Sequence, residues 1–424
     1  MDGQKLKNIL ILCDAFPPAF NPRMGYLCKY LPEHGWNPII VTEYVPENIF
    51  SNLSTVQNIK YINFYWKKNG KISRLKYVTM FFAELLLDYK NRRLRKEAEM
   101  VIGSNDISFI LASVSFRAFP ALAASWVGKA HRIPYIVDCR DIYEQFPNRE
   151  YSSKVMFKSA WINRAVDVVL QKKYKSRRNK ILRSASTVTT VSEWHRQELK
   201  KYNANAHLIY NGFDGDAFYF KPVVSRMFKI TYVGRIESEA VKDPSLLFES
   251  VAFLANKNMI TPDTFRVQFY LLNQSSKTII NKMIEKYRLE KYIDVFGDVE
   301  NEKVPDILNE SSILLLLANR TTEQQSPKGI MGTKVYEYLA VEKPVLCVRN
   351  DESCLEETIK ATCSGISAST VEQVNTFITD QYTEWQKNGF THQRTCRAAI
   401  EKFSRRYQAR QFAGLIESSG GCAV

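Results

Sequence analysis

The sequence predicts an α/β protein made of two Rossmann-like domains that face a cleft. The chain has 424 residues, which is too long for one compact core. It opens with a continuous apolar run at residues 8–13, a proline-containing loop, a helix that ends near Gly35, and a strand at 38–41. This order is typical of a parallel βαβ unit. A second alternating series of the same kind begins at residues 229–234.

Each further strand is expected where a short apolar run follows a helical stretch. In the first series these runs lie at residues 109–113, 135–138 and 187–191. In the second they lie at residues 266–272, 292–296, 313–317 and 345–348. The two series meet near residues 211–221, so we predict a first domain over 1–212 and a second over 213–395. Ligands of such sheets bind beyond the carboxyl ends of the strands.

Composition indicates a soluble globular protein. Hydrophobic residues make up 45% of the chain and charged residues 24%. No apolar run approaches the roughly 20 residues that cross a bilayer, and residues 1–13 carry no signal-peptide pattern. The eight cysteines form no C-x-x-C pair, which favours reduced thiols and a cytoplasmic location.

The positive charge is concentrated in the first half of the chain. Residues 1–220 hold 33 basic and 19 acidic side chains, whereas residues 221–424 hold 26 and 25. Two windows dominate: residues 60–97 carry 11 basic and 3 acidic side chains, and residues 154–183 carry 10 and 1. Both windows contain apolar or aromatic stripes, so we expect a surface for anionic lipid at the inner face of the membrane. A solvated helical face is the alternative, and no nucleic-acid-binding signature accompanies the charge.

The segment 332–340 predicts a nucleotide site. It is a glycine-containing loop that opens a short helix and is followed by the strand at 345–348. The first turn of a helix presents N–H groups and partial positive charge, which suit a phosphate. We expect Gly332, Thr333 and Lys334 to contact the donor phosphates, and Glu337, one turn on, to accept hydrogen bonds from a ribose. An ordinary N-cap with a solvated glutamate is the alternative.

This segment resembles the donor site of family 4 glycosyltransferases with the GT-B fold, in which Lys-x-x-Glu-Tyr-Leu-Ala precedes Gly/Glu-Lys-Pro-Val. The resemblance implies a C-terminal helix, here residues 396–418, that crosses back to the first domain. It also implies transfer with retention of anomeric configuration. One position departs from the pattern, because Gly329 stands where many relatives carry a second glutamate. The backbone of residues 326–332, or Glu323, would then hold the transferred sugar.

A second motif completes the donor side. The Gly-Arg pair at Gly234 and Arg235, followed by Lys242, resembles the pair of cations that grips the donor diphosphate in this family. Arg235 and Lys242 are therefore the predicted catalytic cations, because fixed positive charge stabilises a departing diphosphate. Ordinary surface cations beside a strand are the alternative. We expect no metal and no cofactor; the Asp-x-Asp of residues 214–216 lies among turn-forming residues and is interpreted as structural.

Two charged segments predict the acceptor side. Arg23 and Gly25 follow the first strand, and Asp138, Arg140 and Asp141 follow the strand at 135–138. They resemble the acceptor-side segments of the family, and Asp141 is the predicted catalytic carboxylate. A proline-stiffened turn and a structural ion-pair cluster are the alternatives.

A histidine is missing from this side of the sequence. Many relatives carry one about where Ser113 and Ser115 stand, and this chain has no histidine near them. A histidine-based role at that point is therefore not expected.

Together these features predict a glycosyltransferase of the hexosyltransferase class. It would move a sugar from a nucleoside-diphosphate donor to a saccharide or lipid-linked saccharide, in cell-surface polysaccharide synthesis, without metal. A nucleotide-sugar 2-epimerase of the same fold and a catalytically inactive membrane scaffold are the alternatives.

Overall fold

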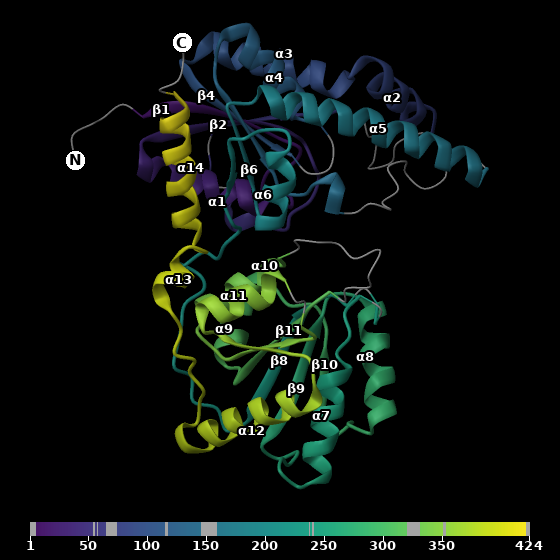
Figure 1. Ribbon diagram of the computed structural model, residues 1–424, viewed down its shortest axis with the longest axis vertical. Coiled ribbons are helices and arrows are strands. Elements are labelled where there is room, and N and C mark those ends of the chain that lie inside the picture. Colours follow the sequence, from purple (N-terminus) through teal and green to yellow (C-terminus); the bar gives the residue numbers. More distant parts are fainter. Residues whose placement is uncertain are drawn as a thin grey trace. The chain divides into compact units, whose positions relative to one another are not determined.

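The computed structural model divides the chain into two compact units (Figure 1). Unit 1 comprises residues 1–210 and 405–424, and unit 2 comprises residues 211–404. The sequence predicts a boundary between residues 212 and 213 and a helix at 396–418 that packs on the first domain, whereas in the structure the boundaries lie at 210/211 and 404/405. The structure describes residues 6–53, 56, 58–64, 74–114, 118–145, 159–236, 238–239, 241–319, 331–350 and 353–420.

Unit 1 is built on a seven-stranded parallel sheet with the order β3-β2-β1-β4-β5-β6-β7. The central strands are almost wholly buried, because helices cover both faces of the sheet. The strands are β1 Lys7–Cys13, β2 Trp36–Glu43, β3 Ile59–Ile62, β4 Ile107–Val114, β5 Tyr135–Cys139, β6 Thr187–Thr190 and β7 Ala206–Leu208.

The helices of unit 1 enclose two apolar clusters, one on each face of the sheet. The last helix of the chain, α14, packs against α1 and buries Ala409, Phe412 and Ile416 in one of these clusters. The helices are α1 Pro22–Tyr30, α2 Arg74–Leu87, α3 Tyr89–Ser104, α4 Ala121–His131, α5 Ala160–Ser184, α6 Glu193–Lys200 and α14 Arg405–Gly420, with short 3-10 turns η1 Leu31–His34, η2 Ser51–Leu53 and η3 Tyr143–Gln145.

Unit 2 repeats this architecture with a six-stranded parallel sheet, in the order β10-β9-β8-β11-β12-β13. Its strands are β8 Phe228–Gly234, β9 Phe265–Leu271, β10 Ile293–Phe296, β11 Ile313–Leu317, β12 Val345–Val348 and β13 Gly365–Ala368. Its helices are α7 Ser245–Asn256, α8 Gln274–Tyr287, α9 Val304–Asn309, α10 Thr333–Ala340, α11 Cys354–Thr362, α12 Val371–Asn388 and α13 Arg397–Glu401, with η4 Asn301–Lys303.

The α/β prediction is confirmed, since both sheets are parallel and every predicted strand is present. The sequence pattern missed three strands, β3, β7 and β13, which lie at sheet edges. The final predicted helix is interrupted: α13 and α14 are separated at Ser404, which pairs with Phe213. Among the described helices, none is both long enough and apolar enough to cross a membrane.

Candidate active site

The carboxyl edge of the unit 2 sheet gathers most of the predicted donor residues. Strand β8 ends at Gly234, and its neighbour β11 and the next strand, β12, end at the same edge because all three run parallel. The loops that leave these strands therefore share one side of the sheet. Arg235 and Lys242 follow β8, and α10 opens after the segment that leaves β11.

Gly234 brings the start of α10 to the end of β8. Its φ of +144° is a conformation that residues with a side chain rarely adopt. The Lys334 side chain crosses the bare backbone there, so that a Cβ added at Gly234 would clash with its Nζ and Cε. The Lys334 ammonium lies 4.7 Å from the centre of the Tyr232 ring, within cation–π range. The predicted residues Gly234 and Lys334 are thus in contact.

Arg235 and Lys242 are also brought together. The Arg235 side chain is exposed, and its carbonyl accepts hydrogen bonds from Lys242 Nζ at 3.2 Å and from Tyr232 Oη at 2.6 Å. The next residue, Ile236, is fixed by Ser276 Oγ, which accepts from its N–H at 2.9 Å and donates to its carbonyl at 3.0 Å. Two cations therefore lie along one anchored loop at the edge of the sheet.

The first turn of α10 lies exposed. Gly332 occupies the N-cap position and provides no side-chain acceptor, and no acidic residue lies in the first turn. Gly332 and Thr333 are solvent-exposed, and Glu337 is half-buried one turn further on. Such a helix start favours an anion. The preceding loop, with Glu323 and Gly329, lies outside the described residues.

The structure adds Arg349, which the sequence reasoning missed. It follows β12 directly and donates from Nε to Asp243 Oδ2 at 3.1 Å and from Nη2 to Ser245 Oγ at 2.8 Å. Asp243 Oδ1 in turn accepts from the Ser245 N–H at 2.9 Å. This network holds the start of α7 next to Lys242. A charged residue directly after the predicted strand at 345–348 was the signal that could have identified it.

A polar cavity of roughly 350 Å³ opens beside this loop. None of the predicted donor residues lines it. Its walls are formed by Glu239, Asp243, Ser245, Glu249, Lys282, Met283, Lys286 and Tyr287. Glu239 and Asp243 of the loop that carries Lys242 belong to the cavity wall, whereas Lys242 itself does not.

On the acceptor side, in unit 1, Arg23 and Asp138 form a buried ion pair. Arg23 Nε and Nη2 donate to the two carboxylate oxygens of Asp138, each at 2.9 Å. Arg23 also donates to the carbonyls of Ile209 and Tyr210 at 3.0 Å, and Thr189 Oγ1 donates to Asp138 at 2.7 Å. Both side chains are almost fully excluded from solvent. Their partners lie in the protein, so the geometry matches the ion-pair alternative, and a role in shaping the acceptor side would be indirect.

Gly25 is buried in α1, where it serves packing. A Cβ at this position would lie 2.6 Å from Pro17 Cγ and 3.0 Å from Leu53 Cδ1. These distances are shorter than ordinary carbon contacts, so a larger residue would displace the proline loop. The contact with an acceptor that we predicted for Gly25 stays a prediction.

Arg140 and Asp141 are the more accessible members of the acceptor-side set. Arg140 Nη1 donates to Asn21 Oδ1 and Nη2 donates to Asp14 Oδ1, both at 3.0 Å, so the loops after β1 and β5 are tied together. Asp14 is 31% exposed in its side chain, and Asp141 is half-buried beside Arg140. Ser113 is fully buried, and Ser115 lies outside the described residues.

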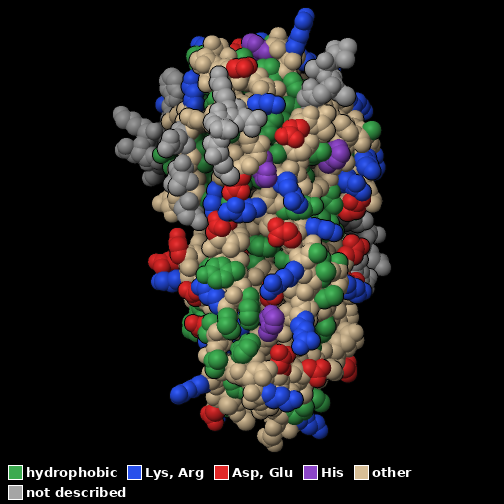
Figure 2. Space-filling view, turned by 90° about the vertical axis from the view of Figure 1, so that its left-hand side faces the viewer, with side chains coloured by type: hydrophobic (Ala, Val, Ile, Leu, Met, Phe, Trp, Pro, Cys, Tyr) green, Lys and Arg blue, Asp and Glu red, His purple; other side chains and the backbone are tan. Residues whose placement is uncertain are grey.

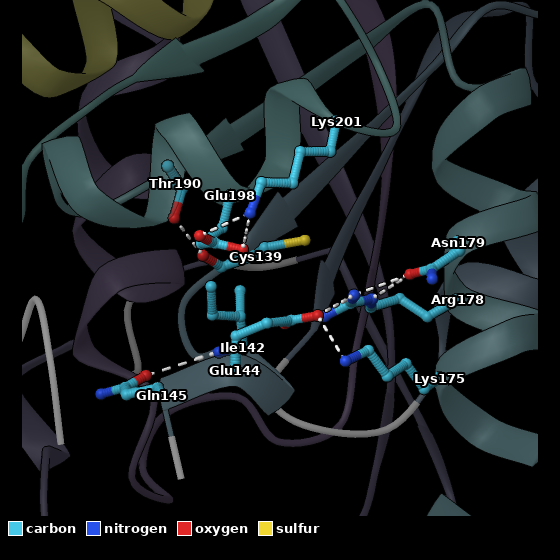
Figure 3. A network of polar contacts seen from close by, with 10 residues as sticks. All are labelled: Cys139, Ile142, Glu144, Gln145, Lys175, Arg178, Asn179, Thr190, Glu198 and Lys201. Carbon is cyan, nitrogen blue, oxygen red and sulfur yellow. Dashed lines mark hydrogen bonds and ion pairs between the residues drawn. The ribbon is translucent and has the colours of Figure 1, made fainter. Parts of the chain in front are cut away.

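An ion-pair network joins η3, which follows the loop of Arg140 and Asp141, to α5 (Figure 3). Glu144, three residues after Asp141, accepts from Arg178 Nη1 and Nη2 at 2.8 and 2.9 Å, and Lys175 Nζ lies 3.2 Å from it. Burial alone would raise the pKa of Glu144, but the hydrogen bonds and charge of Arg178, with Lys175, lower it to about 2. The carboxylate is therefore ionised at neutral pH and connects η3 to α5.

The Asp-x-Asp sequence forms a turn. Asp214 is buried, and its Oδ1 accepts from the Asp216 N–H at 3.2 Å. Its carbonyl accepts from the N–H groups of Ala217 and Phe218. Among the residues that the structure describes, no three acidic, cysteine or histidine side chains lie close enough to hold a metal ion.

Comparison with known proteins identifies two glycosyltransferase regions. Residues 23–217 match the model of Glycosyltransferase Family 4, and residues 220–389 match that of Glycosyl transferases group 1. No curated protein matches the sequence.

Solved structures share the fold along nearly the whole chain. A glycosyltransferase from Rickettsia africae matches with a TM-score of 0.62 at 16% identity, covering 98% of this chain and 99% of its own. HepE from Anabaena, in complex with UDP, matches with a TM-score of 0.59 at 14% identity, covering 97% and 100%. A putative UDP-N-acetylglucosamine 2-epimerase from Listeria monocytogenes matches with a TM-score of 0.55 at 11% identity, covering 97% and 96%. The predicted GT-B fold is confirmed.

Proposed function

Since the chain is a family 4-like glycosyltransferase with the GT-B fold, we propose that it transfers a sugar from a nucleoside-diphosphate donor to an acceptor hydroxyl. The observation that carries the proposal is the cluster of Gly234, Arg235 and Lys242 beside the exposed first turn of α10. It combines two cations with a helix start, which are the groups that bind a diphosphate. Structures of HepE with UDP and with UDP-glucose support a nucleotide-sugar donor.

Each donor-side residue has a role that follows from its chemistry. Arg235 and Lys242 neutralise the charge that develops on the leaving diphosphate, helped by N–H groups at Gly332 and Thr333. Lys334 lies over Gly234, close enough to add a third positive charge. Glu337 holds the ribose hydroxyls, since a carboxylate accepts two such hydrogen bonds. The positive charge comes from the protein, so the reaction proceeds without metal.

The acceptor is a saccharide or lipid-linked saccharide. Arg140 and Asp141 contact it from the loop after β5, while Arg23 and Asp138 support that loop from the interior. Gly25 allows the loop after β1 to pack closely on α1. Asp141 orients the attacking hydroxyl, and the leaving phosphate takes its proton in a transfer that retains configuration. The enzyme acts in the cytoplasm, at the inner face of the membrane, in cell-surface polysaccharide synthesis.

A thermal-shift titration tests the donor site. UDP, GDP, ADP, CMP and TDP are compared, each with magnesium and with EDTA. A ligand present at 100 times its Kd stabilises the folded state by about 2.7 kcal/mol. We expect stabilisation by one diphosphate, unchanged by EDTA. Glu337→Gln should weaken this binding about tenfold through loss of charged hydrogen bonds, whereas Glu285→Gln, on the exposed surface of α8, should not.

A nucleotide-sugar 2-epimerase is the second candidate function, favoured by the shared fold of the Listeria protein. Nuclear magnetic resonance of a UDP-sugar incubated with the enzyme separates the two functions. Conversion of the donor into its 2-epimer without an acceptor would establish the epimerase. No shift with any nucleotide would contradict both enzymes and favour the inactive scaffold.

A further inference from the structure

Helices α2 and α5 lie side by side at one edge of unit 1 (Figure 1). Leu85 of α2 packs against a cluster that contains Leu170 and Tyr174 of α5. Two polar bonds add to this contact: Lys173 Nζ donates to the carbonyl of Leu85, and Arg177 pairs with Asp88, directly after α2. These bonds fix the end of α2 against the middle of α5. We name the exposed apolar side chains of this pair, with the exposed basic side chains of α5, the α2–α5 surface.

The α2–α5 surface concentrates apolar side chains that ordinary packing would bury. Among the described residues, seven of the twenty exposed large apolar side chains lie on these two helices. Trp161 is the most exposed, at 78%. The seven are Phe82, Leu86, Leu87, Trp161, Ile162, Val168 and Val169. An exposed patch of this kind marks a site of interaction.

The apolar residues of α5 follow the helical period. Trp161, Val168 and Val169 stand at i, i+7 and i+8, so they share one face, and Lys172 continues that face. The opposite face carries the buried residues Leu170, Tyr174, Arg178 and Ile181. The first half of α5 therefore carries an apolar stripe that points away from the core of unit 1.

Positive charge borders the apolar stripe. Arg164, Lys172, Lys180 and Arg183 are exposed on α5, which holds one acidic residue, Asp167. By contrast, acidic and basic side chains are interspersed on the face of the molecule that Figure 2 shows. The concentration of basic side chains on α5 thus accompanies its exposed apolar residues.

We propose that the α2–α5 surface docks unit 1 on an anionic lipid bilayer, with Trp161, Val168 and Val169 in the headgroup region and the basic side chains on lipid phosphates. Apolar side chains beside a basic border suit such a surface, and an indole favours the interface. A second copy of the chain would bring two basic surfaces together, which like charge opposes. The proposal deepens the proposed function, because a lipid-linked acceptor would be presented by the same bilayer.

The same helix connects this surface to the acceptor-side loop. Arg178 and Lys175, in the second half of α5, hold Glu144, which follows Asp141 in the chain (Figure 3). Docking through the first half of α5 would therefore bring the loop of Arg140 and Asp141 toward the lipid surface as part of one packed unit.

Vesicle sedimentation of the full chain tests the docking. Vesicles of equal parts phosphatidylcholine and phosphatidylglycerol are compared with pure phosphatidylcholine. The protein should sediment with the mixed vesicles at low salt and be released at high salt. The double variant Val168→Ser/Val169→Ser should weaken binding about tenfold. Val224→Ser, at a valine of unit 2 that is even more exposed, should leave it unchanged.

Two further variants distinguish the attraction of basic side chains to lipid phosphates from the insertion of Trp161 into the headgroup region. Lys172→Ala should weaken binding about fivefold, and Lys257→Ala, an exposed lysine of unit 2, should not. Trp161→Phe should retain binding but lose a blue shift in tryptophan fluorescence that vesicles produce in the parent protein. Equal losses in patch and control variants would overturn the proposal, as would a dimer that the double variant abolishes in ultracentrifugation.

Nucleotide titration of the same variants distinguishes this proposal from the proposed function. Unchanged nucleotide binding with lost vesicle binding is the expected result. A protein that binds vesicles through these residues but no nucleotide would keep the docking surface and contradict the transferase. The reverse would keep the transferase and contradict the docking.

Discussion

The charged residues predicted for the acceptor, in unit 1, and those predicted for the donor, in unit 2, differ in their burial. In unit 1, Arg23 and Asp138 are buried and bonded to one another, to Thr189 and to backbone carbonyls. In unit 2, Arg235 is exposed and Lys242 is half-buried beside it. The sequence motifs on both sides look alike, since each is a charged residue after a strand.

Burial determines what such a residue can do. A buried ion pair has lost its hydration, and only complete hydrogen bonding offsets that cost. An exposed cation keeps its water and exchanges it for a phosphate at little cost. We therefore expect the acceptor-side pair to control stability and the donor-side cations to control activity.

The largest effect expected from this contrast is on the stability of unit 1. Asp138→Asn leaves the Arg23 guanidinium buried without its counter-charge, which should lower the free energy of unfolding by about 3–5 kcal/mol. Urea unfolding of the full chain measures it. The matched control is Asp294→Asn, which removes an exposed pair with Arg266 and should cost at most about 1 kcal/mol. Equal losses would show that the pair in unit 1 is not special.

Donor-side charge should affect catalysis instead. Lys242→Ala should lower kcat/KM by about 10²- to 10³-fold, because it removes positive charge beside the leaving diphosphate. The free energy of unfolding should change little, since the side chain is half-buried and bonds to one carbonyl of the same loop. Lys257→Ala provides the control for removing a charge from unit 2. A near-normal rate in Lys242→Ala would remove this residue from the mechanism.

The Glu144–Arg178 pair predicts a pH dependence of stability. The folded-state pKa of Glu144 is about 2, below the unfolded value near 4.3, so the pair stabilises the protein above that unfolded value. Its contribution, on the order of 2 kcal/mol after allowance for solvent, is lost as pH falls from about 5 toward 2.

Urea unfolding of the parent protein and Glu144→Gln across this range tests the prediction. The difference between them should be largest near neutral pH and shrink on acidification. Glu198→Gln, which removes a pair with Lys201 at the end of α6, should show a smaller difference. A gap between parent and Glu144→Gln that stays constant from pH 7 to the acid limit would contradict the assignment.

The same distinction between buried and exposed positions explains what the sequence could predict. Strands such as β1, β4 and β11 are buried on both faces, so they appear as continuous apolar runs. The edge strands β3 and β13 are partly exposed and lack that signal. The break between α13 and α14 depends on the pairing of Ser404 with Phe213, a contact 191 positions away that no local pattern contains.

For the candidate site, the sequence predicted which residues lie there better than it predicted the partners of their side chains. The motif placed Gly234, Arg235 and Lys242 on one loop, and the structure shows them together. It could not show that Arg23 would meet Asp138, because that pair joins residues 115 positions apart. Arg349 was missed for the same reason, since its partners Asp243 and Ser245 lie on another loop.

Arg349 gives the smallest expected effect. It forms a partly buried ion pair with Asp243 next to the more exposed cations Arg235 and Lys242, so it tests whether burial separates structural from catalytic charges. Asp243 is buried and Arg349 is about one-third exposed, and together they hold the start of α7 next to Lys242. If Arg349 only positions Lys242, Arg349→Met should lower kcat/KM about tenfold, the value of one charged hydrogen-bonded pair.

Arg349→Lys should then recover part of the activity, because an ammonium still pairs with Asp243 but has no second nitrogen that reaches Ser245 at the same time. Nucleotide affinity separates the roles: positioning leaves the Kd for the diphosphate nearly unchanged and lowers kcat, whereas direct phosphate contact raises that Kd in both variants. A loss in Arg349→Met as large as that in Lys242→Ala, with weakened nucleotide binding, would make Arg349 a third cation of the donor site. In that case Arg349 would contact the diphosphate even though its partner Asp243 is buried.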